Sequence, residues 1–360
     1  MQKERAVLAG TDPATLAELG RLADTAGAEI VGQLTQKRLK PDPKYFIGSG
    51  KLEELKALAA ANQADLVVFD APLTPSQERN LEDALGLKVV NRTELIIDIF
   101  AQHARSREGK LQVELAQSNF RLTRLTGHGV QMSRLGGGIA TRGPGETKLE
   151  YDRRRIKKRI SELNREIDKV RRERSLRRAK RRLSHLQLVA LVGYTNSGKS
   201  TLLNTLSRAD VLTADKLFAT LDPTTRRLRL SSGLNILLTD TVGFIRHLPH
   251  QLVTAFRATL EEVSEADLLL HVVDISQPDF EGQIAAVFTV LEELNCAVKP
   301  MITVFNKLDC LGKDPEKKLL EKYRPAVAIS AYYGTGLDKL EELLVKSLSQ
   351  PPEQPPATAA

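Results

Sequence analysis

The stretch GYTNSGKS, residues 193–200, satisfies the pattern GxxxxGK[ST] and decides the fold of the second half of the chain. It follows the apolar stretch QLVALV and precedes TLLNTLS, so a strand, a glycine-rich loop and a helix follow in the order that a phosphate-binding loop requires. Backbone N–H groups at the start of such a helix bind phosphates, the lysine reaches the outer phosphates, and the serine hydroxyl binds Mg²⁺. The sequence therefore predicts a nucleotide site in which Lys199 and Ser200 have these roles. A surface lysine in a glycine-rich turn is the alternative.

Three further motifs each follow a predicted strand. DTVG (240–243) follows NILLT, NKLD (306–309) follows PMITVF, and SAY (330–332) follows AVAI. Asp240 can hold Mg²⁺ through water, and Gly243 lets its N–H approach a γ-phosphate. Asp309 can accept from N1–H and the exocyclic amine of guanine, a donor pair that adenine lacks, so this position selects GTP over ATP. Alone, each motif is often an ordinary turn. Together, at strand ends where open α/β sheets bind ligands, they indicate one guanine nucleotide site.

The segment LFATLDPTTR (217–226) lies between the phosphate-binding loop and DTVG. Thr220 is the candidate that closes over the γ-phosphate and Mg²⁺. Thr224 and Thr225 compete on sequence alone, and a threonine of a turn or strand is the alternative. Loss of the γ-phosphate would release the segment. After DTVG, Phe244 stands where Ras-like enzymes carry the glutamine that orients water, so we expect slow intrinsic hydrolysis that a docking surface accelerates.

This set of motifs resembles the translation-factor-type GTPase domain over about residues 187–348. The fold class is therefore expected to be α/β, with a P-loop GTPase domain whose mostly parallel sheet has helices on both faces. The catalytic candidates are Lys199, Thr220 and Gly243. The expected GTP-binding residues are Gly193, Tyr194, Thr195, Asn196, Ser197, Gly198, Lys199, Ser200, Thr201, Phe218, Ala219, Thr220, Leu221, Asp222, Asp240, Thr241, Val242, Gly243, Asn306, Lys307, Leu308, Asp309, Ser330, Ala331 and Tyr332.

Asn196 is also a candidate for a monovalent cation site. It has the position that helps to bind K⁺ beside the phosphates in some GTPases with a similar loop. Capping of the loop by the side chain is the alternative.

Residues 1–108 alternate strand-like and helix-like stretches, which predicts a smaller N-terminal α/β domain. Strands are expected at RAVLAG, AEIVGQL, ADLVVFD and LKVVN, and helices at 13–27, 50–62, 76–85 and 93–105. The stretch IGSGK (47–51) looks like a second phosphate-binding loop, but Tyr45 stands where the pattern needs glycine and Leu52 replaces the Ser or Thr. We therefore expect Ser49 to open a helix, with a second nucleotide or nucleic-acid activity as the alternative.

Residues 109–185 are expected to form a long helical hairpin. Helices are predicted at 110–126 and from 149 to about 183, joined by a glycine-rich loop at 127–147. In the second helix Ile156, Ile160, Leu163, Ile167 and Val170 follow coiled-coil-like spacing, and one helix cannot bury such a seam alone. The GTPase domain then spans 186–348, and 349–360 is a proline-rich tail expected to be disordered.

The charge of the chain is concentrated in that hairpin. The net charge is +8, but residues 153–182 hold 16 Lys or Arg against 4 Asp or Glu. A solvated helix face is the alternative, although the excess of one sign favours a polyanionic partner. Only 4% of residues are aromatic, which favours recognition of RNA shape and backbone over stacking of bases. The RNA-binding candidates are Arg153, Arg154, Lys157 and Lys158.

Other classes of protein are excluded by composition. The chain has 360 residues, enough for roughly two or three domains. Its apolar runs are too short for a transmembrane helix, and its start is unlike a signal peptide. The two cysteines, Cys296 and Cys310, lie in no metal-ligand pattern and fit a reducing compartment. We therefore expect a cytoplasmic protein without stable membrane insertion, with some peripheral membrane association as the alternative.

The whole chain resembles the HflX family of ribosome-associated GTPases. The residues that carry the resemblance are FDAPLTPSQERNLEDAL (69–85), NRTELIIDIFAQHARSREGKLQVELAQ (91–117), GGGIATRGPGETKLEYDRRRI (136–156), GYTNSGKS, LFATLDPTTR and DTVGFIRHLPHQLVTAFRATLEE (240–262). The resemblance implies binding to the RNA and proteins of the large ribosomal subunit, ribosome-stimulated GTP hydrolysis, and splitting of stalled or idle ribosomes. It also implies Ser200 and Thr220 as Mg²⁺ ligands, which favours Thr220 over the other threonines.

The sequence departs from that family's pattern at a few places. His103 stands where Arg is usual and Asn91 where Asp is common, and both departures are expected to affect only local bonds. The chain stops soon after the last expected helix, so the extra C-terminal domain of some members is expected to be missing. A monomer is expected. The remaining alternatives are a GTPase in ribosome assembly or RNA modification, or a switch that binds a regulatory protein or a membrane surface.

Overall fold

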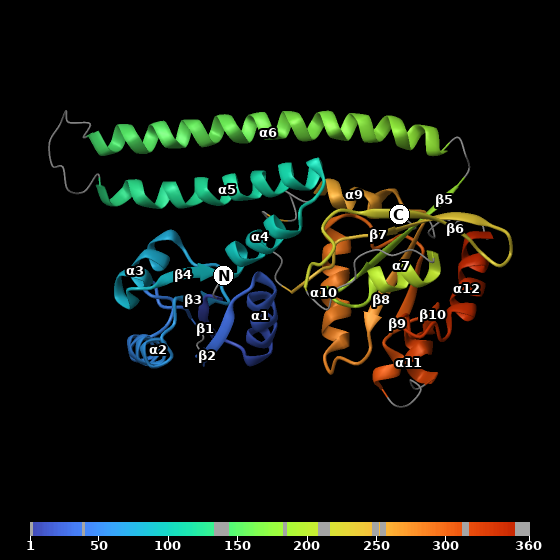
Figure 1. Ribbon diagram of the computed structural model, residues 1–360, viewed down its shortest axis with the longest axis horizontal. Helices are drawn as coiled ribbons and strands as arrows, with labels where there is room; N and C mark the ends of the chain where they lie inside the picture. Colours follow the sequence, from blue (N-terminus) through green and yellow to red (C-terminus); the bar gives the residue numbers. More distant parts are fainter. Residues whose placement is uncertain are drawn as a thin grey trace, which may run out of the picture. The chain divides into compact units, whose positions relative to one another are not determined.

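A computed structural model of the chain describes residues 3–37, 40–132, 144–182, 186–207, 217–246, 252, 257–311 and 317–349. The centre of the predicted glycine-rich loop (133–143) and the predicted tail from residue 350 onward lie outside the described residues. The chain divides into two compact units, Met1–Val170 with Pro249–Ala255 and Arg171–Leu248 with Phe256–Ala360. Both units are α/β, as predicted (Figure 1). The predicted boundaries at 108/109 and 185/186 remain predictions.

The first unit is built on a parallel sheet of four strands in the order β2-β1-β3-β4. The apolar runs that predicted β1, β3 and β4 are buried, because both faces of a parallel sheet are covered, whereas Leu34 is the buried residue of the edge strand β2. The strands are β1 (Arg5–Gly10), β2 (Glu29–Thr35), β3 (Leu66–Phe69) and β4 (Lys88–Asn91).

Helices cover both faces of this sheet. One face packs against the apolar sides of α2 and α3, while α1 packs on α4 over the other. Capping stabilises the predicted start of α3, where Thr74 and Gln77 form a reciprocal capping box. The helices are α1 (Pro13–Ala26), α2 (Ser49–Ala61), α3 (Pro75–Leu85) and α4 (Arg92–His103).

Two long helices continue the first unit, α5 (Arg107–Met132) and α6 (Pro144–Arg182), and α6 runs on into the second unit. They lie antiparallel in Figure 1, and Leu111 and Leu115 of α5 pack with Leu163 of α6. Ile160, Ile167 and Val170 lie partly buried against this cluster and Ile156 is not part of it, so the predicted partner covers four of the five predicted seam residues.

The predicted loop at 127–147 is too long at both ends. Residues 127–132 belong to α5, since a glycine inside a helix costs only about 1 kcal/mol. Pro144 opens α6, because the fixed φ of proline suits the first helical position.

The second unit contains a sheet of six strands in the order β10-β9-β8-β5-β7-β6. All neighbours are parallel except β6 and β7, which are antiparallel. The prediction of a mostly parallel sheet is therefore confirmed. The strands are β5 (Gln187–Gly193), β6 (Thr224–Arg229), β7 (Asn235–Asp240), β8 (Leu268–Asp274), β9 (Met301–Asn306) and β10 (Ala326–Ala328).

Helices pack on both faces of this sheet as well. On one face Leu270 and Val272 of β8 pack with α7 and α12, and on the other Val273 packs with α10 and α11. The four motifs begin at or just after the carboxyl ends of β5, β7, β9 and β10. The helices are α7 (Lys199–Ser207), α9 (Arg257–Glu265), α10 (Phe280–Glu293), the short η1 (Leu308–Cys310), α11 (Lys317–Lys322) and α12 (Leu337–Ser349). Among the described residues, no helix has the length and apolar character needed to cross a bilayer.

Candidate functional site

The phosphate-binding loop runs from the end of β5 to the first turn of α7. Gly198 has φ +91°, a left-handed conformation, and a Cβ there would lie 2.2 Å from Asn306 Nδ2. Only glycine fits both conditions. The Lys199 ammonium donates to the carbonyls of Tyr194 at 2.8 Å and Gly193 at 3.2 Å. Burial lowers the pKa of Lys199 to about 8, so its ammonium is still mostly charged near pH 7, and a nearby anion would favour this form further.

Three oxygen-bearing side chains meet beside this lysine. Ser200 Oγ lies 2.8 Å from Thr220 Oγ1 and donates to Asp240 Oδ2 at 2.5 Å. Asp240 is fully buried, burial raises the pKa of its carboxyl group, and its Oδ1 has no hydrogen-bond partner among the described residues. A buried carboxylate with a spare oxygen fits a small divalent cation, and hydroxyl and carboxylate oxygens are what Mg²⁺ prefers.

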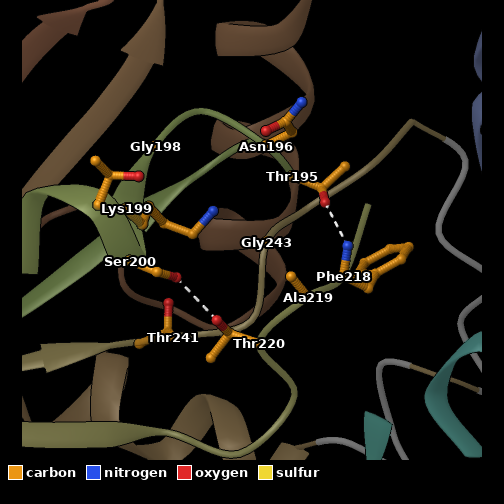
Figure 2. Close-up of a pocket in the computed structure, with 11 residues that line it drawn as sticks. Thr195, Asn196, Gly198, Lys199, Ser200, Phe218, Ala219, Thr220, Thr241 and Gly243 are labelled. Atoms are coloured by element: carbon orange, nitrogen blue, oxygen red, sulfur yellow. Dashed lines mark hydrogen bonds between the residues drawn. The ribbon is translucent and has the colours of Figure 1, made fainter. Parts of the chain in front are cut away.

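The geometry separates Thr220 from its two competitors. Thr224 and Thr225 are the first residues of β6 and pair in register with Asp240 and Thr239 of β7. Thr225 Oγ1 is bonded to Thr239 Oγ1 at 2.9 Å, away from Ser200. Of the three threonines, Thr220 is the one with a hydrogen bond to Ser200 (Figure 2).

The second part of the site joins β9 and β10 to the phosphate-binding loop. Asn306 donates through Nδ2 to the Ser197 carbonyl at 2.9 Å, and its Oδ1 accepts from Ala331 N–H at 2.9 Å. Ser330 Oγ donates to Asp309 Oδ1, and this bond lowers the pKa of Asp309. The carboxylate therefore stays ionised and keeps its acceptor character, as reading of guanine requires.

Lys307 and Tyr332 differ in how far the structure restrains them. Lys307 Nζ lies 2.8 Å from the buried carboxylate of Asp274 at the end of β8. The ring of Tyr332 is 77% exposed and packs edge-on against Tyr333. Sequence reasoning missed Asp274, although an acidic residue ending the apolar strand LLLHVV was a usable signal.

Backbone hydrogen bonds join the DTVG segment and the residue after it to the phosphate-binding loop. Thr195 N–H donates to the Phe244 carbonyl at 2.7 Å, and Phe244 N–H donates to the Gly193 carbonyl at 3.1 Å. A Cβ on Gly243 would lie 2.6 Å from Thr195 Cα, so only glycine permits this approach. Phe244 and Ile245 are buried, and neither can orient a water molecule.

A pocket in this unit brings many of the predicted residues together (Figure 2). It is lined by Thr195, Asn196, Gly198, Lys199, Ser200, Thr201, Phe218, Ala219, Thr220, Thr241 and Gly243. The predicted residues that do not line it are Gly193, Tyr194, Ser197, Leu221, Asp222, Asp240, Val242, Asn306, Lys307, Leu308, Asp309, Ser330, Ala331 and Tyr332. The two groups are nevertheless joined by the bonds of Asp240 and Asn306, so all four strand ends belong to one region.

The four predicted RNA contacts lie within two turns of α6 in the first unit. The Arg154 side chain is 79% exposed and pairs with Glu150 at 3.1 Å. Lys157 and Lys158 are exposed, whereas Arg153 is half-buried. The four therefore do not form one uniformly exposed face.

Comparison with known proteins identifies the parts of the chain. The family profile described as GTP-binding GTPase N-terminal matches residues 13–101, and the profile described as GTP-binding GTPase Middle Region matches residues 103–181. The profile described as 50S ribosome-binding GTPase matches residues 188–307. Between them the profiles match residues of both compact units.

Relatives match over nearly the whole length. A protein named GTPase HflX from Caldanaerobacter subterraneus subsp. tengcongensis is 54% identical over 351 residues, which are 96% of this chain and 81% of the relative. GTPase HflX from Escherichia coli is 46% identical over 340 residues, 94% of this chain and 80% of the relative.

Among solved structures, a GTP-binding protein from the hyperthermophilic archaeon Sulfolobus solfataricus in complex with GDP is similar to this chain. It is 26% identical with a TM-score of 0.51, and the match covers 96% of this chain and 99% of that one. A structure described as the SsGBP and GDP complex has a TM-score of 0.54 at 26% identity, with coverage of 96% and 100%.

Proposed function

Because the chain belongs to the HflX family of GTPases, we propose that it binds the large ribosomal subunit and uses the binding and hydrolysis of GTP to split stalled or idle ribosomes. The chain is a GTP hydrolase that forms GDP and phosphate. The match of residues 188–307 to the profile described as 50S ribosome-binding GTPase is the observation that carries the proposal of a ribosomal partner. That partner implies a cytoplasmic protein.

The basic helix α6 supports RNA as the surface that is bound. Its apolar seam is occupied by α5, and some of its basic side chains pair with protein groups, as Arg159 does with Glu114 of α5 at 2.7 Å, but the positive charge of the helix greatly exceeds these pairs. Residues 153–182 carry a net charge of +12, and ribosomal RNA presents phosphates at high density. Binding through such contacts releases counterions, so it should weaken steeply with salt.

Within the second unit, α6 is also tied to the helix that follows the DTVG segment. Arg171 of α6 pairs with Glu261 of α9, and Arg174 lies 3.9 Å from the buried Glu262. Since DTVG precedes α9 and approaches the γ-phosphate, a change there can bias α9 and, through these ion pairs, the end of α6. We propose that the bound nucleotide alters the affinity for RNA by this route.

The chemistry proposed for hydrolysis follows from the buried charges. The Lys199 ammonium would stabilise negative charge on the outer phosphates, and backbone N–H groups from the loop and Gly243 would donate to them. Ser200 and Thr220 would bind Mg²⁺, with Asp240 holding it through water; when bound, the ion neutralises phosphate charge. Because Phe244 occupies the glutamine position, we propose that the ribosome completes the orientation of the attacking water.

Binding to isolated subunits tests the proposal. The protein should co-sediment with large subunits, more strongly with a non-hydrolysable GTP analogue than with GDP, and incubation with GTP should convert idle ribosomes into subunits. Accumulation of precursor particles on depletion, or pelleting with anionic vesicles in place of ribosomes, would contradict the proposal. So would an equal preference for the small subunit.

A matched pair of variants tests the basic helix. Replacing Arg153, Arg154, Lys157 and Lys158 by Gln should weaken subunit binding and reduce the slope of log affinity against log salt by about 3 to 4. GTP affinity should not change. The control replaces four exposed lysines of the second unit by Gln, which removes the same charge: Lys317, Lys318, Lys339 and Lys346. Equal loss in both variants would show that only overall charge matters.

A further inference from the structure

Thr195 is bonded to both segments that border the position expected for the γ-phosphate. Its side-chain Oγ1 accepts from the Phe218 N–H at 2.8 Å (Figure 2). Its own N–H donates to the Phe244 carbonyl at 2.7 Å. One residue of the phosphate-binding loop therefore holds the segment before β6 with its hydroxyl group and the segment after β7 with its backbone.

The segment held by the hydroxyl group is in an unfavourable conformation. Phe218 has φ +57°, in the left-handed region that a bulky side chain avoids, and its ring is 2% exposed. Such a backbone persists only where surrounding contacts hold it. The bond to Thr195 is one of these contacts, and it lies two residues before Thr220, whose hydroxyl reaches Ser200.

These contacts are formed by protein groups alone. The bond from Phe218 to Thr195 needs no phosphate, and neither does the bond between Thr220 and Ser200. A protein that already populates the closed conformation of 217–220 spends less free energy on closing it when a triphosphate arrives. A diphosphate has no γ-phosphate for Thr220 or Gly243 to approach, so closing this segment gives it no such advantage.

We propose that Thr195 is a positioning residue that sets the preference for GTP over GDP, because its hydroxyl group stabilises 217–220 in the conformation closed against the phosphate-binding loop. This inference rests on the γ-phosphate position assigned under the proposed function. It differs from the roles of Lys199 and Ser200, which act on the phosphates or on Mg²⁺ directly.

The test compares Thr195→Val, which keeps the shape and removes the acceptor, with Thr195→Ser, which keeps the hydroxyl group. Thr289→Val, on the exposed side of α10, is the control for the substitution itself. Affinities of the full chain for GDP and for a non-hydrolysable GTP analogue are measured by titration calorimetry with Mg²⁺. Thr195→Val should lose about 2- to 10-fold more affinity for the analogue than for GDP, as loss of one hydrogen bond allows. Thr195→Ser should keep the wild-type ratio of the two affinities, and Thr289→Val should behave as wild type.

Hydrogen exchange provides a second measurement that does not depend on the analogue. In the GDP form, amides of 217–220 should exchange faster in Thr195→Val than in wild type or Thr195→Ser. Equal losses for GDP and the analogue, or unchanged affinity for both with unchanged exchange, would overturn the proposal. If wild type itself bound neither nucleotide, the assigned nucleotide site would fail first, and this result is distinct from the others.

Discussion

Replacing Gly243 by alanine should slow GTP hydrolysis and leave GDP binding unchanged. The added Cβ would lie 2.6 Å from Thr195 Cα and 3.0 Å from Lys199 Nζ. Thr195 Cα belongs to the backbone of a loop held by Asn306, so it cannot move aside as the end of a flexible side chain would. The DTVG segment must therefore retreat from the loop.

That retreat breaks two backbone hydrogen bonds, from Thr195 N–H to the Phe244 carbonyl and from Phe244 N–H to the Gly193 carbonyl. Each is worth about 0.5–1.5 kcal/mol net, so the closed arrangement is destabilised by about 1–3 kcal/mol. If hydrolysis proceeds from the closed arrangement, the rate should fall roughly 5- to 150-fold. GDP lacks the γ-phosphate that the Gly243 N–H is expected to approach, so its affinity should stay the same.

The assay is single-turnover hydrolysis of γ-labelled GTP, with GDP affinity measured in parallel. The matched control is Gly50→Ala in α2, where a Cβ meets nothing within 4 Å. It should leave hydrolysis unchanged. An unchanged rate in Gly243→Ala, or a loss of GDP affinity as large as the loss of rate, would refute the reasoning.

Three further expectations concern base selection, pH and monovalent cations. Asp309→Asn should weaken GTP and favour xanthosine triphosphate, because an amide can donate to xanthine O2; unchanged GTP affinity in calorimetry would count against the assigned base contact. Burial and the charge of Lys199 lower the pKa of His271 from 6.5 to about 4, so the unfolded chain takes up a proton that the folded chain resists, and stability should fall as the pH falls through this window. Urea unfolding should show about 2 kcal/mol of this loss between pH 7 and pH 5 in wild type and not in His271→Leu, and identical pH dependence in both would refute it. If Asn196 helps to bind K⁺, hydrolysis should be faster in KCl than in NaCl, and equal rates would end the potassium hypothesis.

The sequence predicted the elements of the fold because their signals are local. Each predicted strand of the first unit agrees with the observed one to within two residues, since Val, Ile, Leu or Phe concentrate in each of them. The hairpin followed from a seam that needs a partner, and α5 supplies it. The ends of the glycine-rich loop were wrong, because a helix extends through isolated glycines and a proline can open the next one.

Contacts between residues far apart in the chain could not be predicted, either in the first unit or at the nucleotide site. Nothing near Asp70 in the sequence indicates that Arg92 bonds to it at 2.7 Å and also pairs with Glu18. Likewise, Thr224 and Thr225 compete with the candidate Thr220 on sequence alone. Only the pairing of β6 with β7 directs Thr225 to Thr239 and leaves Thr220 beside Ser200.

We propose above that the ribosome accelerates GTP hydrolysis by completing the orientation of the attacking water. The most direct measurement is the steady-state GTPase rate with and without purified large subunits, with small subunits as the control. We expect a slow rate for the protein alone, a marked increase with large subunits that declines as the salt concentration rises, and little change with small subunits. A rate near 1 s⁻¹ for the isolated protein, on the ordinary enzyme scale, or no response to large subunits, would contradict it.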